Sequence, residues 1–326
     1  MCKEIFALSD PGPSHKEMPN SQPQIAKFGI VAIIGPPNAG KSTLLNTLLG
    51  QKLAIVTPKP QTTRNRISGI LSQDEAQAVF LDTPGLHKSS QALNRHLVQS
   101  AWQALTEADL VLLVLDAARC AVNKRRLQED LEEVQACREL QSIQLAVVLN
   151  KTDQLKDKQL LLPLMDCLGQ IWPQAVLFPA SALQNQGTQE ILKHILQILP
   201  PGPALYPEDQ LSTLPLRFLA TEIIREKLFL FLQQELPYSM AVQIEKWLED
   251  EPSRFVVIHA VIYVSRAAHK PMVIGHKGQM LKKVGREARL ELENVLGQQV
   301  HLELWVKIRP DWIKDQRSLQ ELIPRT

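Results

Sequence analysis

The segment from Gly35 to Ser42, Gly-Pro-Pro-Asn-Ala-Gly-Lys-Ser, restricts the fold of this chain more than any other stretch. It matches the pattern G-x-x-x-x-G-K-[ST], an apolar run over 28–34 precedes it, and residues 43–49 carry apolar side chains at helical spacing. Strand, glycine-rich loop and helix in this order form a phosphate-binding loop, because backbone N–H groups and the helix N-terminus face the anion. The alternative is an ordinary glycine turn before a helix.

We therefore predict a bound nucleoside triphosphate and Mg²⁺, with the Lys41 ammonium on the outer phosphates and the Ser42 hydroxyl on the metal. The predicted phosphate-contacting residues are Gly35, Pro36, Pro37, Asn38, Ala39, Gly40, Lys41, Ser42 and Thr43.

The base is predicted from Asn150-Lys-Thr-Asp153, which follows the apolar run 145–149. Ligands of open α/β sheets bind at the carboxyl ends of strands. A carboxylate at Asp153 accepts from the N1–H and the 2-amino group of guanine. Adenine has no hydrogen on N1 and no amino group at C2, so it offers neither donor there. Asn150 is expected to face the other edge of the base, and the 179–182 loop to bring a backbone N–H to the guanine carbonyl. The predicted base-binding residues are Asn150, Lys151, Thr152, Asp153, Ser181 and Ala182.

A switch is predicted between these motifs at Asp82-Thr-Pro-Gly85, directly after the apolar run 78–81. Asp82 would hold Mg²⁺ through water, and the Gly85 N–H would contact the γ-phosphate. Upstream, a threonine would close on Mg²⁺ when the γ-phosphate is present, and Thr63 is preferred over Thr62. The alternative for the upstream segment is a polar loop with a threonine-rich turn.

The contacts predicted for this switch are Asp82, Thr83, Pro84, Gly85 and Leu86, the metal set is Ser42, Thr63 and Asp82, and the catalytic set is Lys41, Thr63, Asp82 and Gly85. Many GTPases place a water-orienting glutamine where this chain has Leu86. A leucine does not align water, so we expect slow intrinsic hydrolysis that needs another group or a partner.

The chain is expected to divide into four parts. Residues 1–25, rich in Pro and Ser, are predicted to be a disordered tail, and apolar strands alternate with helices over 26–200, which predicts a mostly parallel α/β sheet. Prolines at 200, 201, 203 and 207 break this alternation, so 201–215 is predicted to be a linker. Residues 216–326 are expected to form a smaller α+β domain of order α-β-β-α-α-β.

This last order, with G-x-x-G between the two later helices, resembles a type II KH domain, which clamps about four nucleotides of single-stranded RNA. Seven basic residues and one acid lie between Arg266 and Arg289, a formal charge of +6 in 24 residues. The alternative is a solvated charged helix face, and phosphate contacts would instead make binding salt-dependent. The predicted RNA-contacting residues are Ile274, Gly275, His276, Lys277, Gly278, Lys282 and Lys283.

Together the motifs GPPNAGKS, QTTRNR, DTPGL, NKTD and SAL resemble the Era family of bacterial GTPases, and the resemblance extends over roughly residues 26–315. It implies GTP hydrolysis, binding near the 3′ end of small-subunit rRNA, and a role in small-subunit maturation. It also implies a possible site for K⁺ at Asn38, although that asparagine could simply cap its own backbone. Pro36 and Ala39 depart from the family's usual Arg and Val.

Two other classes were weighed. A membrane-surface signalling GTPase would use the KH-like module for protein or lipid, and peripheral membrane contact is implied by the family. A tRNA-modifying GTPase would need a further cofactor domain and a reactive C-terminal cysteine, which this sequence lacks.

Composition agrees with a cytoplasmic protein, expected to be a monomer. The formal net charge is only +2, and no apolar run approaches the roughly 20 residues that span a bilayer. The four cysteines show no C-x-x-C spacing, so reduced thiols are expected.

Overall fold

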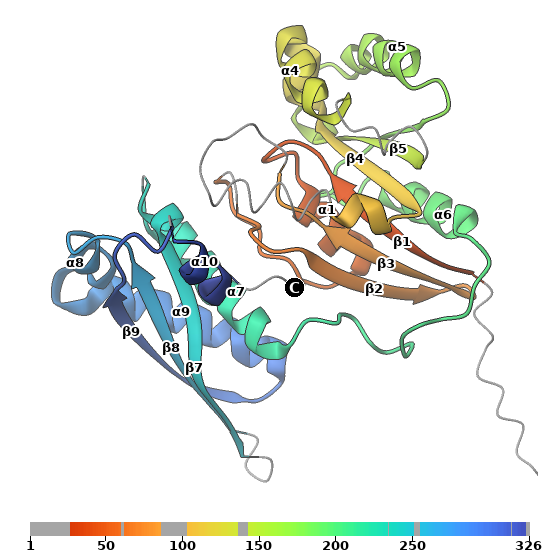
Figure 1. The fold of residues 1–326 in the computed structure, drawn as a ribbon. Helices are drawn as coiled ribbons and strands as arrows, with labels where there is room; N and C mark the ends of the chain where they lie inside the picture. The colour runs from red at the N-terminus through yellow and green to blue at the C-terminus, as the bar shows by residue number, and fades with distance from the viewer. Residues whose placement is uncertain are drawn as a thin grey trace, which may run out of the picture.

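The computed structural model describes residues 27–59, 62–85, 103–135, 143–233, 235–250, 255–313 and 315–323. It shows two units, one built on a six-stranded sheet and one on a three-stranded sheet (Figure 1). Helices cover both faces of the larger sheet, whereas α7 and α9 lie on one face of the smaller sheet. The described residues contain no helix long and apolar enough to cross a membrane.

The larger sheet has the strand order β2-β3-β1-β4-β5-β6, with all neighbours parallel except the antiparallel pair β2 and β3. The elements of this unit are β1 Lys27–Ile34, α1 Lys41–Leu49, β2 Ile67–Gln73, β3 Ala76–Asp82, β4 Leu110–Asp116, α3 Ala117–Val122, α4 Lys124–Gln135, β5 Gln144–Asn150, α5 Leu161–Ile171, β6 Val176–Pro179 and α6 Thr188–Ile198. The charged segment 124–140 predicts a helix, and the described part of this segment forms α4, since 136–142 lie outside the described residues.

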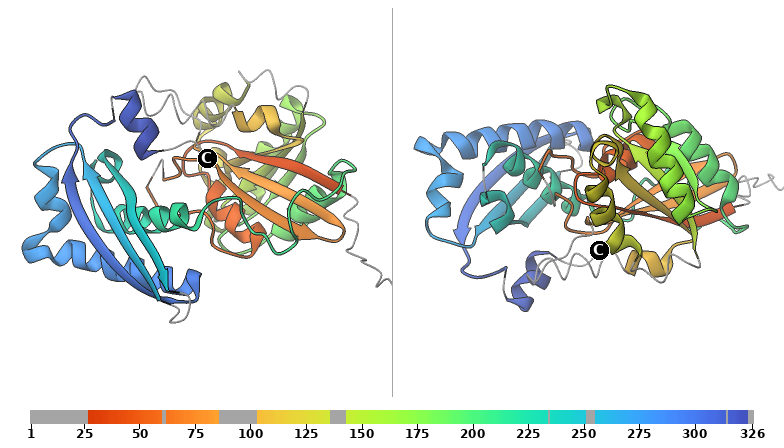
Figure 2. Two further views of the ribbon diagram at one scale, coloured as in Figure 1. Left: turned by 60° about the horizontal axis from the view of Figure 1, so that its bottom comes forward. Right: turned by 90° about the horizontal axis from the view of Figure 1, so that it is seen from above.

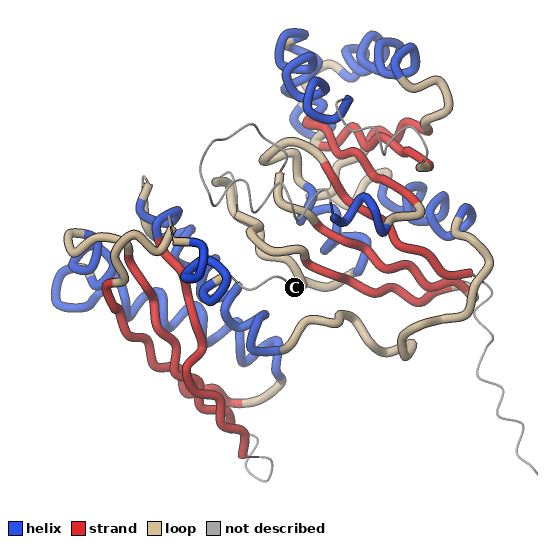
Figure 3. The backbone as a smooth tube through the Cα atoms, viewed as in Figure 1, coloured by secondary structure: helices blue, strands red, loops and turns tan. Residues whose placement is uncertain are grey.

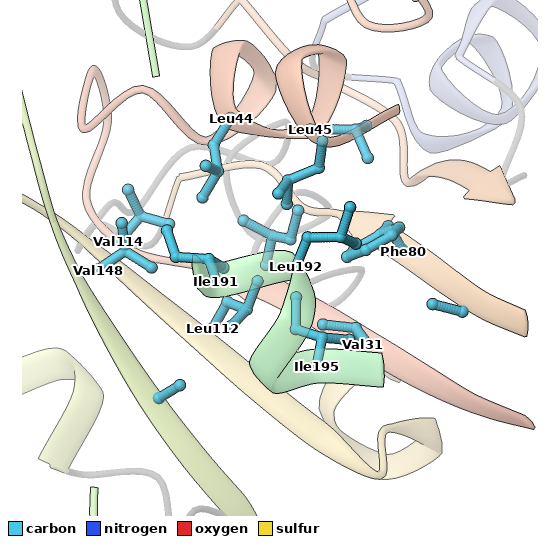
Figure 4. Packing of buried hydrophobic residues seen from close by; sticks show 14 of the residues in the cluster. Val31, Leu44, Leu45, Phe80, Leu112, Val114, Val148, Ile191, Leu192 and Ile195 are labelled. Carbon is cyan, nitrogen blue, oxygen red and sulfur yellow. The ribbon is translucent and has the colours of Figure 1, made fainter. Parts of the chain in front are cut away.

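Burial on both faces explains why the central strands are continuous apolar runs. Six of the seven residues of β4 are buried. On one face, Leu44 and Leu45 of α1 pack with Ile191 and Ile195 of α6 against strand residues such as Phe80 (Figure 4). Each such side chain contributes about 1.5–3 kcal/mol when fully buried. This packing fixes the carboxyl ends of β1, β3 and β5, where the sequence places its polar motifs.

A connection without helix or strand, residues 199–215, runs from α6 to the second unit and appears as one long loop in Figure 3. It is fastened to the larger sheet. The fully buried Gln77 side chain donates to Tyr206 O at 2.8 Å and accepts from Tyr206 N at 3.0 Å. Further along, Ile70 N donates to Leu211 O at 2.8 Å, and the hydroxyls of Ser68 and Thr213 lie 2.5 Å apart. The connection therefore follows the edge strand β2.

The smaller sheet has the order β7-β8-β9, with β7 and β8 antiparallel and β8 and β9 parallel. Figure 2 shows α7 at the boundary between the two units. The elements of this unit are α7 Leu216–Phe231, η4 Leu236–Ser239, β7 Met240–Asp250, β8 Phe255–Val264, α8 His269–Ile274, α9 Gln279–Leu296, β9 Gln299–Ile308 and α10 Gln316–Leu322.

The predicted fold class is confirmed, including the order α-β-β-α-α-β, but two details differ from the prediction. The alternating side chains of 238–245 predict the first strand of the smaller unit over those residues. The strand instead begins at Met240, because Leu236–Ser239 forms a 3₁₀ turn, and it continues to Asp250. A terminal helix, α10, was not predicted. It packs with the fully buried Trp312 on the sheet face opposite α7 and α9.

Candidate functional site

The phosphate loop lies between β1 and α1 with Lys41 folded over it. The Lys41 side chain is buried, and its ammonium donates to Gly35 O at 3.1 Å and to Pro36 O at 3.0 Å. Burial lowers its pKa from 10.5 to about 8, although the nearby Asp82 carboxylate acts in the opposite direction. The positive charge is thus held at the loop by backbone carbonyls.

A side chain at Gly40 of this loop would meet a neighbouring residue. The φ of Gly40 is +95°, and a Cβ there would lie 2.2 Å from the Asn150 Nδ2 atom. At the same loop, a Cβ on Gly85 would lie 2.8 Å from Pro37 N. Both glycines therefore allow a neighbouring loop to approach the phosphate loop.

Three oxygen-bearing side chains meet at the start of α1. The Ser42 hydroxyl lies 2.9 Å from Thr63 Oγ1 and donates to Asp82 Oδ2 at 2.5 Å. Asp82 Oδ1 is buried without a hydrogen-bond partner among the described residues, and burial raises the Asp82 pKa from 3.8 to about 6. Hydroxyl and carboxylate oxygens are the ligands that Mg²⁺ takes in proteins. A buried carboxylate oxygen left unpaired beside two hydroxyls fits a divalent cation.

The hydrogen bonds distinguish Thr63 from Thr62 as the candidate metal ligand. Thr62 Oγ1 bonds to Thr57 Oγ1 at 2.6 Å and to Lys59 O at 2.9 Å, within its own loop. Only Thr63 reaches Ser42. On the other side, the Thr83 hydroxyl donates to Ile33 O at 2.8 Å and fastens the end of β3 to β1. Leu86 lies outside the described residues.

The predicted base-binding residues gather at the ends of β5 and β6. The Asp153 carboxylate accepts from the Ser181 hydroxyl at 2.6 Å, which orients it. Lys151 has a φ of +64°, and its ammonium pairs with Asp116 at 2.7 Å. The Thr152 N–H donates to Ala180 O at 3.1 Å, so the two loops are joined through their backbones as well.

The Asn150 amide was expected to face the base, and since an amide nitrogen carries two N–H groups, that role stays a prediction beside the contacts that the amide makes with the protein. Its Nδ2 donates to Ala39 O at 2.8 Å and its Oδ1 accepts from Ala182 N at 2.9 Å. It therefore ties the phosphate loop to the 179–182 loop. A backbone N–H of the 179–182 loop was expected to reach the guanine carbonyl, and this role also stays a prediction. In this structure Ser181 N donates to Gln186 O at 2.9 Å and Ala182 N donates to Asn150 Oδ1.

Asp116 is a site residue that the motif search did not find. It ends β4 directly beside Asn150 in the sheet register, and it also accepts from Arg119 N as the N-cap of α3. A carboxylate at a strand end next to the Asn-Lys-x-Asp strand was the available signal. Its ion pair holds the Lys151 stem in place.

The second glycine loop, residues 275–278, lies between α8 and α9. Gly275 and Gly278 have φ values of +73° and +78°, whereas His276 and Lys277 are exposed. A groove of about 550 Å³ continues from Gly278 along α9 and β9. Its charged and apolar lining includes Lys282, Arg286, Arg289, Leu302 and Leu304.

The sequence pattern predicts only part of this groove. Arg286 and Arg289 were counted as basic residues but were not named as contacts, although their spacing from Lys282 places all three on one helix face. Lys283, which was named, instead lies with its ammonium 4.2 Å from the Phe231 ring centroid of α7.

Comparison with known proteins agrees with this geometry. Residues 30–151 match the family model described as 50S ribosome-binding GTPase, and residues 235–313 match the KH domain model. The chain is similar to GTPase Era of Nitratidesulfovibrio vulgaris (strain DSM 19637 / Miyazaki F), with 51% identity over 296 residues, 91% of this chain and 96% of the relative. It is 45% identical over 295 residues to GTPase Era of Syntrophus aciditrophicus (strain SB), 90% of this chain and 94% of the relative.

Solved structures agree at the level of the whole chain. An Era variant from Aquifex aeolicus bound to GDP·AlF₄⁻ is 42% identical with a TM-score of 0.86, and Era in complex with MgGDPNP and nucleotides 1506–1542 of 16S ribosomal RNA is 41% identical with a TM-score of 0.86. Each alignment covers 92% of this chain and 100% of that structure. The expected resemblance is confirmed: this chain belongs to the Era family of GTPases, GTP-hydrolysing enzymes with a C-terminal KH domain.

Proposed function

We propose that this GTPase is a cytoplasmic switch that binds small-subunit (16S-type) rRNA near its 3′ end and acts in small-subunit biogenesis and rRNA maturation. The observation that supports this most is the basic groove between α9 and β9 beside the second glycine loop. Its relative of 41% identity was solved with nucleotides 1506–1542 of 16S rRNA. We place the domain boundaries at 26–200, 201–215 and 216–326.

In the GTPase domain, Asp153 would select guanine and Lys41 would neutralise the outer phosphates. Ser42, Thr63 and Asp82 would hold Mg²⁺, which when bound neutralises charge developing on the phosphates. The reaction is GTP and water to GDP and phosphate, with transition-state charge stabilised by Lys41 and backbone N–H groups. In the described part of the site, no side chain is placed as a covalent nucleophile.

The switch would operate through Thr63 and the 82–86 segment. Both would be ordered while the γ-phosphate is present, which would release the RNA-binding face, and hydrolysis would then time departure from the ribosome. The same proposal includes peripheral contact with the cytoplasmic membrane.

Charging the second glycine loop tests the RNA part. A Cβ at Gly278 meets nothing within 4 Å, whereas one at Gly275 would lie 2.6 Å from Met280, so Gly278→Asp is the cleaner variant. Gly297→Asp is the matched control, because Gly297 also has a positive φ, +63°, and open space, at the far end of α9. We expect Gly278→Asp to weaken binding of a small-subunit 3′-end RNA about tenfold or more, with wild-type affinity in the control.

Crosslinking in cells tests the identity of the RNA. UV crosslinking of the full chain, followed by sequencing of attached RNA, should give a peak at the small-subunit 3′ end that Gly278→Asp removes and Gly297→Asp keeps. A flat RNA profile together with binding to vesicles of anionic phospholipid would instead support the membrane-surface function.

A further inference from the structure

The loop that joins α1 to β2 and carries Thr63 lies against the KH domain. Lys52 of this loop pairs with Glu226 of α7 at 2.7 Å and with Glu291 of α9 at 2.5 Å. Lys59 donates to two carbonyl oxygens at the C-terminal end of α7, where a cation is favoured by the unpaired carbonyls and the helix dipole. The loop thus belongs to the GTPase domain in sequence but is fastened to the other domain.

Arg64 makes the deepest of these contacts and is the residue directly after Thr63. Its Nη1 donates to Met240 O at 2.7 Å, and its Nη2 donates to Tyr238 O at 2.9 Å and to Pro237 O at 3.2 Å. The guanidinium carbon also lies 5.8 Å from the Phe229 ring centroid. Its acceptors all lie at the junction of η4 and β7 in the KH domain.

This contact is unlike an ordinary surface arginine. Arg64 is only 3% exposed, and burial, with the neighbouring Arg225 guanidinium, lowers its pKa from 12.5 to about 9. A planar fork of donors matches several fixed acceptors at once, which a lysine ammonium does not. Arg66, two residues on, instead pairs with Glu107 of the GTPase domain at 2.6 Å, with both side chains partly exposed.

Neighbouring Cα atoms are held about 3.8 Å apart, so the anchor at Arg64 limits where the Thr63 hydroxyl can lie. That hydroxyl is 2.9 Å from Ser42, inside the oxygen cluster that fits Mg²⁺. We propose that Arg64 is a positioning residue through which the KH domain holds Thr63 in the nucleotide site. The inference rests on the proposed metal and RNA functions. Because linkage is reciprocal, what the KH domain binds would alter GTP affinity by the same factor that GTP alters that binding.

Nucleotide titrations of the full chain test the first step. Arg64→Met should weaken GDPNP binding about tenfold at limiting Mg²⁺ and leave GDP binding unchanged, since under the proposed switch Thr63 contacts Mg²⁺ only while the γ-phosphate is present. Arg66→Met is the matched control and should change neither. An equal loss for GDPNP and GDP would show a general structural role and overturn the proposal.

A double-mutant cycle tests whether Arg64 acts through Thr63. Thr63→Val and Arg64→Met should each weaken GDPNP binding at limiting Mg²⁺, and the double variant should be no weaker than Thr63→Val alone. Additive losses would overturn the proposal. Arg64→Lys retains the charge without the planar fork, so it should keep most of the defect while a thermal melt checks that the chain is folded.

The RNA readout separates this inference from the function on which it rests. The ratio of RNA affinities with GDPNP and with GDP should move toward one in Arg64→Met, with GDP-state RNA affinity unchanged. Failure of the wild-type chain to bind the 3′-end RNA would refute the rRNA function, and the Mg²⁺ titrations would still decide the role of Arg64. An unchanged ratio in Arg64→Met, beside a wild-type ratio different from one, would refute only the Arg64 proposal.

Discussion

The two glycine-rich loops of this protein present positive charge in different ways. In the phosphate loop, Lys41 is 6% exposed and its ammonium is bonded to two carbonyl oxygens. In the KH loop, His276 and Lys277 are exposed, and the adjoining groove is open to solvent. A buried charge acts at a low local dielectric, whereas exposed charges are screened within about 10 Å in 0.1 M salt. We therefore expect substitution of the buried lysine in the phosphate loop to remove nearly all nucleotide binding. Substitution of exposed basic residues near the KH loop should weaken RNA binding by smaller amounts that depend on salt.

The two loops also differ in how neighbouring segments hold them. Asn150 ties the phosphate loop to the 179–182 loop through both ends of its amide, so the loops around the nucleotide are already joined. The groove is instead formed by one helix and one edge strand. A preorganised site costs little reorganisation when its ligand arrives, and an open groove can accept variable RNA backbones.

The largest effect is expected for Lys41→Met. Removing a buried cation from the phosphates should lower GTP binding and turnover by about 100-fold or more. RNA affinity of the nucleotide-free protein should stay at the wild-type value. Fluorescent-nucleotide titration and an RNA binding assay on the same preparation measure both. A modest, salt-dependent loss of GTP binding would contradict the predicted difference between the buried charge of the phosphate loop and the exposed charges of the KH loop.

Asp82→Asn should weaken Mg²⁺-dependent GTP binding and raise the stability of the metal-free folded protein. Because the folded-state pKa of Asp82 is raised from 3.8 to about 6, the metal-free folded protein binds more protons than the unfolded chain between these values. The penalty of the buried carboxylate is absent below pH 3.8 and complete above pH 6, where it approaches about 3 kcal/mol.

Thermal melts in EDTA without nucleotide measure this penalty. Asp82→Asn should raise Tm at pH 7.5, and the gain should shrink by about half at pH 5. The same variant should lose Mg²⁺-dependent GTP binding. A lower Tm at pH 7.5 would show that the carboxylate is satisfied in a way the described contacts do not reveal.

Two adjacent lysines of α9, Lys282 and Lys283, should differ in their contribution to RNA binding. Lys282 lines the groove, so Lys282→Gln should weaken RNA binding several-fold and reduce the salt slope by about 1. Lys283→Gln should mainly cost about 0.5–1 kcal/mol of stability through the lost Phe231 contact. Salt-dependent RNA titrations and urea unfolding measure the pair, and equal RNA defects would refute this division.

The smallest effect concerns Asn38 and K⁺. Asn38 is exposed and has a φ of +64°. If K⁺ binds there, GTP turnover in KCl should exceed that in NaCl by roughly fivefold, about 1 kcal/mol, and Asn38→Asp should reduce the difference. Equal turnover in both salts would exclude the hypothesis.

Sequence was sufficient where one segment supplies both motif and context. The loop from Gly35 to Ser42, the strand before it and the helix after it are contiguous, so their arrangement follows from local pattern. The same holds for the G-x-x-G between α8 and α9. Family and fold class were accordingly predicted correctly.

Contacts between distant segments were not predictable from one sequence. The motif that contains Asn150 predicts a role at the base, but it did not indicate that the amide also bonds to Ala39, 111 positions away. Arg64 was counted only as part of a threonine-rich loop, although its partners lie beyond residue 236. Burial of Trp312 under a terminal helix has the same origin, since nothing local indicates which sheet face it covers.

The fastened connection between the domains has a mechanical consequence. Its last hydrogen bond to the larger sheet joins Thr213 to Ser68, and after it Leu214 and then Phe218 of α7 pack against the core of the GTPase domain. If residues 199–215 formed a loose tether, the KH domain could move freely relative to the GTPase domain. The effective concentration of the KH domain near the nucleotide site would then fall as the tether lengthened. Gln77 and β2 hold this connection, and Arg64 bonds the GTPase domain directly to the KH domain, so these contacts together restrict how far the KH domain can move relative to the nucleotide site.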